Sequence, residues 1–476
     1  MPPMTATPER SVHASLRLVG ADTVVPLVTG EQRRYVNLDY AASAPALVEV
    51  ADAVARTLEW YSSVHRGAGF KSRAATAAYE GARESVQRFF GAREDDAVIF
   101  TRNTTDAINL LAGTLPEGTH VVAFAGEHHA NLLPWKRCGG ARFLNIPESP
   151  ADALQQLDDV LPTLPPCEDP HLVAVTGASN VTGEIWPVRE IAELAHRHGA
   201  RLLVDAAQLA PHAPIDMARD GIDFLAMSGH KLYAPYGAGV LIGERDWLSA
   251  GDPFLRGGGA VKLVTVEETV WAELPDRQEA GSPNVIGAVA LGVACDTLAA
   301  AGMDRVAAEE QELLALAHER FGRIPGFVRY GIWEPRHPRV GLVTFNLQPY
   351  PHDLLAAVLS AEHGIGVRHG CFCAHPLMIR LLQVDDATTA QLMDATRGGG
   401  HPRLPGAARM SFGLGTTADD IETAAVALES IAADGPQWTY DVDERTAEHE
   451  PDPDPRPLPD LGVRLVEHPH AHGESA

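Results

Sequence analysis

Between residues 35 and 302, short apolar runs alternate with segments whose apolar positions recur at helical spacing. The apolar runs predict strands at 97–100, 120–125, 172–176, 201–205, 224–227 and 239–242. The segment 187–198 predicts a crossover helix, because Val188, Ile191 and Leu194 share one face and Gly199 follows as a stop signal. This alternation predicts an α/β domain with a doubly wound, mostly parallel sheet.

The pattern changes near residue 303 and predicts a smaller α+β domain over 303–434. A long amphipathic helix is predicted over 304–321 and a closing helix over 418–432. Strands are expected at 327–330, 340–345 and 409–412. The segment 386–406 contains three consecutive glycines and predicts an inserted short helix followed by a loop.

The two ends of the chain carry weaker patterns. Residues 1–34 predict a loose N-terminal lead-in with one strand-like piece at 15–19. Residues 435–476 form a tail rich in Pro, Asp, Glu and His, which predicts disorder because little apolar surface is available to offset the ordering entropy. Weak metal binding by His468, His470 and His472 is the alternative to a solvated tail.

Length, charge and cysteine content limit the functions that this chain can have. The 476 residues exceed one ordinary core and suggest a large and a small domain. A net charge of −25 argues against nucleic acid as a partner. The apolar runs are too short to cross a bilayer, and residues 1–20 contain no signal-peptide core, so we expect a cytoplasmic protein without a membrane partner. Five scattered cysteines indicate reduced thiols rather than a disulfide framework.

The most informative pair of residues is Lys231, within Ser228-Gly229-His230-Lys231, and Asp205 at the end of a predicted strand. Parallel strands open onto one crevice at their carboxyl ends, so both side chains are expected at the same site. Pyridoxal 5'-phosphate (PLP) enzymes need a lysine for the cofactor aldehyde and a carboxylate for its pyridine nitrogen. The alternative is an unremarkable strand-end acid and a surface lysine.

Other polar residues follow the predicted strands at the same edge. Thr104 and Thr105 open a predicted helix after the strand at 97–100, where hydroxyls and free amides can form a phosphate site; a plain helix cap is the alternative if this segment is taken alone. Ser228 and His230 can donate to the same phosphate. His128 can stack on a ring or transfer protons, although adjacent histidines also occur in packed loops or as metal ligands. Gln208 can reach the phenolic oxygen of the cofactor.

The segment Arg368-His369-Gly370-Cys371-Phe372-Cys373-Ala374-His375 allows three interpretations. A zinc site is disfavoured by the alternating spacing of its Cys and His residues, so no metal is expected. A structural cysteine pair is the plain alternative. A reactive Cys373 on a glycine-flanked loop beside a cationic arginine is favoured. Arg368 and Arg409 are candidates to grip a substrate carboxylate, with ordinary salt bridges as the alternative.

Taken together, the sequence resembles the class V (fold type I) PLP-dependent enzymes, and within them the group II cysteine desulfurases and selenocysteine lyases. The resemblance covers about residues 37–432. Its landmarks are the segments at 38–44, 64–67, 104–109, 127–131, 179–183, 204–208, 228–233 and 281–284, together with the Cys373 loop. Two features depart from the group: Cys371-Phe372 precede Cys373, as in the sulfurase domain of molybdenum-cofactor sulfurases, and 386–406 is extra.

The resemblance implies a role for each matching residue. Lys231 would hold PLP covalently, Asp205 would face the pyridine nitrogen, and His128 would stack on the ring. Asn180 and Arg409, with Arg368 and Ala41 nearby, would bind the substrate. Cys373 would accept sulfur as a persulfide. The cofactor ligands implied by the resemblance are Lys231, Asp205, Gln208, Thr104, Thr105, Ser228, His230, His128 and, from a second copy in a homodimer, the partner subunit's Ser282.

The function expected from this resemblance is cysteine desulfuration, in which L-cysteine becomes L-alanine and sulfur passes to Cys373 and then to an acceptor protein. A class V aminotransferase, epimerase or carbon–sulfur lyase acting on another amino acid is the first alternative, since fold alone does not choose between these reactions. A PLP-bound scaffold without turnover is the second. The choice between cysteine and selenocysteine, the acceptor, and the roles of Cys371, the insertion and the tail stay open.

Overall fold

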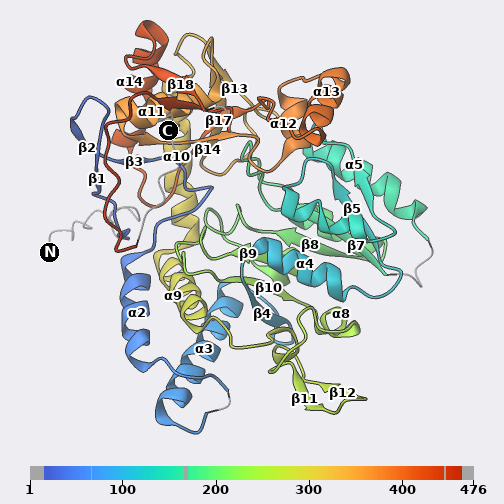
Figure 1. Cartoon of the computed structure of the whole chain (residues 1–476). Helices are drawn as coiled ribbons and strands as arrows, with labels where there is room; N and C mark the ends of the chain where they lie inside the picture. The colour runs from blue at the N-terminus through green and yellow to red at the C-terminus, as the bar shows by residue number, and fades with distance from the viewer. Residues whose placement is uncertain (1–15, 66, 166–169, 444–445, 464–476) are drawn as a thin grey trace, which may run out of the picture.

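The central layer is a seven-stranded sheet (Figure 1). A computed structural model describes residues 16–65, 67–165, 170–443 and 446–463. The strand order is β4-β10-β9-β8-β7-β5-β6, and β10 runs antiparallel to both neighbours while the other neighbouring pairs are parallel. The strands are β4 (Ala97–Thr101), β5 (His120–Phe124), β6 (Arg142–Leu144), β7 (His171–Thr176), β8 (Ala200–Asp205), β9 (Phe224–Ser228) and β10 (Gly239–Gly243).

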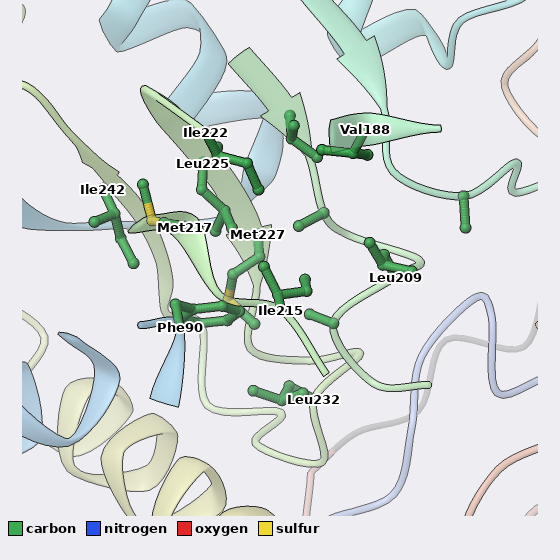
Figure 2. Close-up of a cluster of buried hydrophobic side chains, with 14 of the residues drawn as sticks. Phe90, Val188, Leu209, Ile215, Met217, Ile222, Leu225, Met227, Leu232 and Ile242 are labelled. Atoms are coloured by element: carbon green, nitrogen blue, oxygen red, sulfur yellow. The ribbon is translucent and has the colours of Figure 1, made fainter. Parts of the chain in front are cut away.

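Both faces of this sheet are apolar, as expected for strands covered by helices on each side. Leu225, Met227 and Ile242 point to one face and join the largest core cluster, part of which is drawn in Figure 2. Ile99, Ala226 and Leu241 alternate to the other face and pack in a second cluster with α4. The large-layer helices are α2 (Val48–Trp60), α3 (Phe70–Phe89), α4 (Thr104–Thr114), α5 (Pro150–Val160), α6 (Val188–Arg197), α7 (Met217–Asp220), α8 (Arg245–Ala250) and α9 (Val285–Ala301).

A smaller antiparallel sheet of order β13-β14-β17-β16 follows. Its strands are β13 (Phe327–Arg329), β14 (Leu342–Leu347), β16 (Arg368–Gly370) and β17 (Ala407–Ser411). Three helices supply its core: α10 (Met303–Phe321), α11 (His352–His363) and α14 (Ala418–Asp434). Helices α12 (His375–Leu381) and α13 (Asp386–Arg397) lie beside each other at one side (Figure 1). The predicted helix within the inserted segment is therefore present as α13.

Both ends of the described chain are more ordered than the sequence predicted. The strand expected at 15–19 is wrong: Leu18 makes only an isolated bridge with Leu47, because Gly20, at φ +79°, turns the chain immediately afterwards. The lead-in instead forms a hairpin of β1 (Val24–Pro26) and β2 (Gln32–Arg34). Short pairs complete the fold, namely β3 (Val36–Asn37) with β15 (Ile365–Gly366), and β11 (Val261–Val264) with β12 (Thr269–Trp271).

The disorder predicted from residue 435 is also wrong over part of its range. Strands β18 (Tyr440–Val442) and β19 (His449–Pro451) form a hairpin that packs on α11. The Pro- and acid-rich composition gave no sign of this order, because the partners of the hairpin are polar groups of α11 that are distant in sequence. His468, His470 and His472 lie outside the described residues, as do Arg66 and Cys167.

Among the described residues, no single helix has the length and apolarity to span a membrane. Helices α9 and α10 pass such a test only as a pair bent by 77°. The buried apolar side chains of α9 pack in two core clusters, the first half of the helix mainly in a small one and the second half in the large one.

Candidate active site

A cavity of about 470 Å³ opens at the carboxyl ends of the parallel strands. Its walls come from the loops that follow β4, β5, β7, β8 and β9, with β17 and the loop after β16 from the smaller sheet. This is the edge where open α/β sheets bind ligands. The lining residues are Ala41, Ala42, Ser43, Asn103, Thr104, Thr105, His128, Ala130, Thr176, Asn180, Asp205, Ala207, Gln208, Ser228, His230, Lys231, Arg368, Phe372, Cys373 and Arg409.

Lys231 and Asp205 face this cavity from neighbouring strands. Asp205 is the last residue of β8 and lies opposite Ala226 of β9, while Lys231 follows the end of β9 by three residues. Desolvation lowers the pKa of the Lys231 amine to about 8, against the attraction of Asp205. Burial raises the pKa of Asp205, although the Ala207 amide donates to its carboxylate at 3.0 Å. The sequence correctly predicted that these residues share one site.

The start of α4 forms one wall of the cavity. The Ser228 hydroxyl accepts a hydrogen bond from the Thr104 amide at 2.8 Å and lies 2.7 Å from the Thr104 hydroxyl. Asn103 caps the helix by accepting from the Asp106 amide at 2.9 Å. Gly239 allows this close approach, since a Cβ there would lie 2.7 Å from Asn103 Cα. Thr105 and His230 line the same wall, so two distant loops combine hydroxyls with a helix N-terminus, which suits an anion.

His128 lies in the cavity wall after β5, and a backbone amide holds its ring in place. Its Nδ1 accepts from the Ala130 amide at 3.1 Å, which leaves the proton of the neutral ring on Nε2. Burial, with the nearby charge of Lys231, lowers the pKa of His128 to about 3. The adjacent Glu127 is buried and accepts from Asn131 Nδ2 at 2.8 Å and from the Thr176 amide at 3.0 Å. Glu127 therefore anchors the His128 loop to β7.

Gln208 is buried in the cavity wall, and its side-chain amide has one hydrogen-bonded and one unpaired polar atom. Its Nε2 donates to the Ala41 carbonyl at 2.8 Å, which fixes the direction of the amide. Its Oε1 is buried without a hydrogen-bond partner. An unpaired buried polar atom is costly, so its place in the wall of a cavity indicates a missing ligand.

Arg409 is the buried cation of the cavity. Its Nη1 donates to the Asn180 carbonyl at 2.8 Å, and its Nη2 donates to Asp39 at 3.3 Å. The Phe372 ring lies 4.9 Å from its guanidinium carbon, and its Nε is buried without a partner. Desolvation lowers its pKa, against the attraction of Asp39. Arg368 lies directly opposite Arg409 in the ladder of β16 and β17, so two guanidinium groups converge on one wall.

Cys373 is exposed at the mouth of the cavity, on a turn that is held by two hydrogen bonds from other loops. The carbonyl of Cys373 accepts from the His129 amide at 2.8 Å, and that of Phe372 accepts from Asn180 Nδ2 at 2.7 Å. Phe372 and Cys373 both have positive φ, of 54° and 56°, which is uncommon for residues other than glycine. Cys371 does not line the cavity but packs in a small apolar cluster with Phe372, Leu377 and Met378.

Two of the sequence-predicted residues are placed differently from the rest. Ser282 does not line this cavity but a separate one of about 200 Å³, together with Ser63 and Glu279. Ala41 contributes through its backbone, with its carbonyl on Gln208 and its amide on the Ser411 hydroxyl at 2.9 Å. In the described parts of the chain, no group of three or more His, Cys, Asp or Glu side chains is placed to hold a metal ion. His375 instead stacks on His129, with ring centroids 5.0 Å apart.

Glu127, Asp39 and Phe372 are site residues whose roles the sequence did not predict. Each occurs in a segment that carries the family resemblance, but nothing in those segments indicates which side chain supports a neighbour. The pairing of Asp39 with Arg409 joins residues 370 positions apart, and such a contact leaves no local signal.

Comparison with known proteins identifies the family. The model of the class V aminotransferases matches residues 36–423. The chain belongs to the class V aminotransferase family. A probable cysteine desulfurase of Halalkalibacterium halodurans is 40% identical over 403 residues, which cover 83% of this chain and 92% of that protein. A cysteine desulfurase of Klebsiella pneumoniae is 38% identical over 366 residues, covering 74% of this chain and 87% of that protein.

Solved structures agree with this family. The apo structure of the cysteine desulfurase from Thermococcus onnurineus NA1 has a TM-score of 0.73 and 29% identity, covering 84% of this chain and 94% of that one. The Escherichia coli cysteine desulfurase CsdA, solved as an S-sulfonic acid, has a TM-score of 0.68 and 31% identity, covering 83% and 94%. The resemblance, the fold type I architecture and the assignment to a cysteine desulfurase-like enzyme are thereby confirmed.

Proposed function

We propose that this member of the class V aminotransferase family binds PLP in the 470 Å³ cavity and converts L-cysteine to L-alanine, with the sulfur passing to Cys373. The observation that carries the proposal is the convergence of an amine, a buried carboxylate, two arginines and an exposed thiol on one cavity. Those side chains belong to Lys231, Asp205, Arg368, Arg409 and Cys373. The names of the relatives support the choice of cysteine as the substrate.

The residues of the cavity fit PLP. The Lys231 amine, with its pKa near 8, is partly unprotonated at neutral pH and can hold an aldehyde covalently. Asp205 presents a buried carboxylate for a protonated pyridine nitrogen, and the unpaired Oε1 of Gln208 marks a place for a polar group. Thr104, Thr105, Ser228 and His230 offer hydroxyls, a ring nitrogen and a helix N-terminus to a phosphate. When bound, PLP supplies the electron sink for a carbanion at the substrate α-carbon.

The remaining cavity residues can bind and position an amino acid. Arg409 is buried and has a free Nε, and Arg368 lies opposite it, so the two can hold an α-carboxylate by a charge-assisted fork. Asn180 ties the Phe372 carbonyl to the same wall and thereby places the Cys373 turn beside the arginines. Binding a carboxylate there also relieves the repulsion between the two cations.

The chemical step needs one base and one nucleophile from this chain. The Lys231 amine lines the cavity and can take the α-proton of the substrate. The neutral His128 ring carries its proton on Nε2 and can donate it to a group bound in the cavity. The Cys373 thiolate attacks the substrate sulfur, so that the substrate carbon–sulfur bond breaks and a sulfur–sulfur bond forms. L-Cysteine and the Cys373 thiol become L-alanine and a Cys373 persulfide, which balances all atoms.

Assembly, acceptor and location follow as further parts of the proposal. Ser282 lies away from Lys231 in its own chain, which supports a homodimer where the partner subunit's Ser282 completes the phosphate site. Cys373 is exposed, so an acceptor protein can reach its persulfide. The four described cysteines are free thiols, which supports a reducing cytoplasm. Light scattering of the purified protein tests the dimer, and a monomer at micromolar concentration would contradict it.

The test of the proposed reaction uses PLP-loaded protein, L-cysteine and a thiol reductant. We expect alanine and sulfide in equal amounts, and, without reductant, one added sulfur atom on the peptide that contains Cys373. Cys373→Ser should lose both signals, whereas Cys371→Ser, the matched control two residues away, should keep them. Lys231→Ala should lose alanine formation as well. Undiminished sulfide release by the Cys373→Ser variant would contradict the proposal.

A further inference from the structure

The C-terminal hairpin lies outside the part of the chain that matches the family. The family match ends at residue 423, whereas the described chain continues to 463. We call residues 437–443 with 446–463 the strap. Its strands β18 and β19 pair antiparallel, with Tyr440 opposite Pro451. The strap and the inserted segment 386–406 are the two regions whose course the family resemblance did not anticipate.

One end of the strap is fastened to helix α11 through a single carboxylate. Glu362 accepts hydrogen bonds from the Gln437 amide at 2.9 Å, the Trp438 amide at 3.1 Å and the Tyr440 hydroxyl at 2.8 Å. The Trp438 indole donates to the Pro453 carbonyl at 2.9 Å, which closes the strap on itself. These contacts fix where the hairpin begins.

The other end joins the strap to the inserted segment through Asp353, a buried carboxylate of α11. One oxygen of Asp353 accepts from Arg403 of the insertion, and the other accepts from His449 Nδ1 at 2.8 Å and from the His449 amide at 3.2 Å. Burial alone would raise the pKa of Asp353, but these partners hold it well below its ordinary value. Arg403 belongs to a stretch without helix or strand that leads into β17. The shared carboxylate therefore links the insertion and the strap.

The same junction contacts the strand that carries Arg368. His369 of β16 lies 3.9 Å from Glu448 of the strap and stacks on His352, with ring centroids 5.6 Å apart. The insertion packs tightly there, because a Cβ on Gly406 would lie 2.8 Å from Gly370 Cα. Strand β16 is the edge strand of the smaller sheet and pairs with β17 over three residues only.

Charge repulsion between two arginines weakens the pairing of the edge strand β16 with β17. Arg368 and Arg409 are directly opposite each other in the ladder, and like charges in that arrangement are destabilising. The pair is useful because it faces the substrate cavity, but repulsion favours separation of β16 from β17 when no carboxylate is bound. A short edge strand has few hydrogen bonds of its own to resist that separation.

From these contacts we infer that the strap is a positioning element for substrate binding, in which Asp353, His449 and Arg403 hold β16 and the entry to β17 so that the arginine pair keeps its spacing. The inference rests on the proposed function for the identity of the carboxylate. None of the three residues lines the cavity, so they act through Arg368 and Arg409.

The test compares His449→Ala with Leu458→Ala, an exposed position of the same strap, in the full-length PLP-loaded protein. His449→Ala should raise KM for L-cysteine about three- to tenfold with kcat changed by less than about twofold. Leu458→Ala should match wild type. In an Arg368→Ala background, the effect of His449→Ala on KM should shrink, because the residue through which it acts is gone.

Hydrogen exchange gives a readout that does not depend on turnover. Amides of Arg368–Gly370 and Ala407–Ser411 should exchange faster in His449→Ala, while PLP absorbance per chain stays at the wild-type level. Wild-type KM together with wild-type exchange in these strands would overturn the inference, as would a loss of bound PLP that accounts for the whole effect. If wild type releases no alanine from cysteine, the proposed function fails, and the exchange experiment still decides the role of the strap.

Discussion

Replacing Glu127 by Gln tests how the His128 loop is held. In the native protein, the two oxygens of the buried Glu127 carboxyl group accept one hydrogen bond from Asn131 Nδ2 and one from the Thr176 amide. The Gln side chain has nearly the same shape but only one acceptor oxygen, and Asn131 cannot turn to help, because its Oδ1 accepts from the Trp135 indole at 3.2 Å. One buried donor loses its partner, which costs about 1–3 kcal/mol of unfolding free energy.

The pH dependence of this loss has a definite sign. Burial, with Asp205 nearby, raises the pKa of Glu127 from 4.5 to about 8 in the folded protein. A raised folded-state pKa means that the contribution of this group to stability is fully present below pH 4.5 and is lost as the pH rises towards 8. At about 1.4 kcal/mol per pH unit, the wild type loses about 5 kcal/mol at most through this group. Glu127→Gln does not titrate, so its disadvantage should shrink as the pH rises.

Urea unfolding of both proteins at pH 5.5, 7 and 9 measures this difference. We expect the wild type to be the more stable protein at pH 5.5, and the variant to equal or exceed it at pH 9. Comparing the two at each pH cancels the titration of the many other groups. Glu117→Gln, at an exposed position, should show no such trend. A stability difference that is constant across the three pH values would refute the reasoning.

Three further predictions concern the cavity itself. Arg409→Lys keeps the charge but loses the two-point contact of a guanidinium group with a carboxylate, so KM for L-cysteine should rise about 10- to 100-fold with little change in kcat. An unaltered KM would contradict this. Phe372→Leu removes the ring beside the guanidinium, and a rise in KM of about threefold or more is expected, with no change if the ring only fills space. His128→Gln should lower kcat about 100-fold or more. Because the His128 pKa lies near 3, the pH profile of the remaining activity between pH 5 and 7 should keep its shape, and a lost acidic limb would count against that assignment.

The pattern of apolar residues predicted most of the large sheet. Six predicted strands match β4, β5, β7, β8, β9 and β10 to within one residue at each end, because each is buried on both faces and the middle of each run is apolar. The seventh strand, β6, was missed. Its three residues lie at the edge of the sheet and are mostly exposed, so burial left no apolar run to detect. Helix α11 was missed as well.

The site was predictable where residue type and strand end coincide. Asp205 ends a buried strand, Lys231 and His128 each follow one, and the fold then requires their proximity. The supports around them were not predictable, because Glu127 acts on the Thr176 amide and Arg409 on the Asn180 carbonyl. Such contacts depend on tertiary distance and not on local sequence. The ordered strap escaped prediction for the same reason, since its anchor Glu362 lies 75 or more positions away.

The antiparallel strand β10 has a consequence for how the chain is made. It separates β4 from β9, so Ala97 meets Gly243 and Thr101 meets Gly239 across more than a hundred intervening residues. Pairing over such a separation is slow and comes late. A chain emerging from the ribosome therefore cannot bring Thr104 to Ser228 until synthesis has passed residue 243, and Arg409 arrives later still. The cavity is thus complete only in nearly full-length chains, because its lining residues run from Ala41 to Arg409.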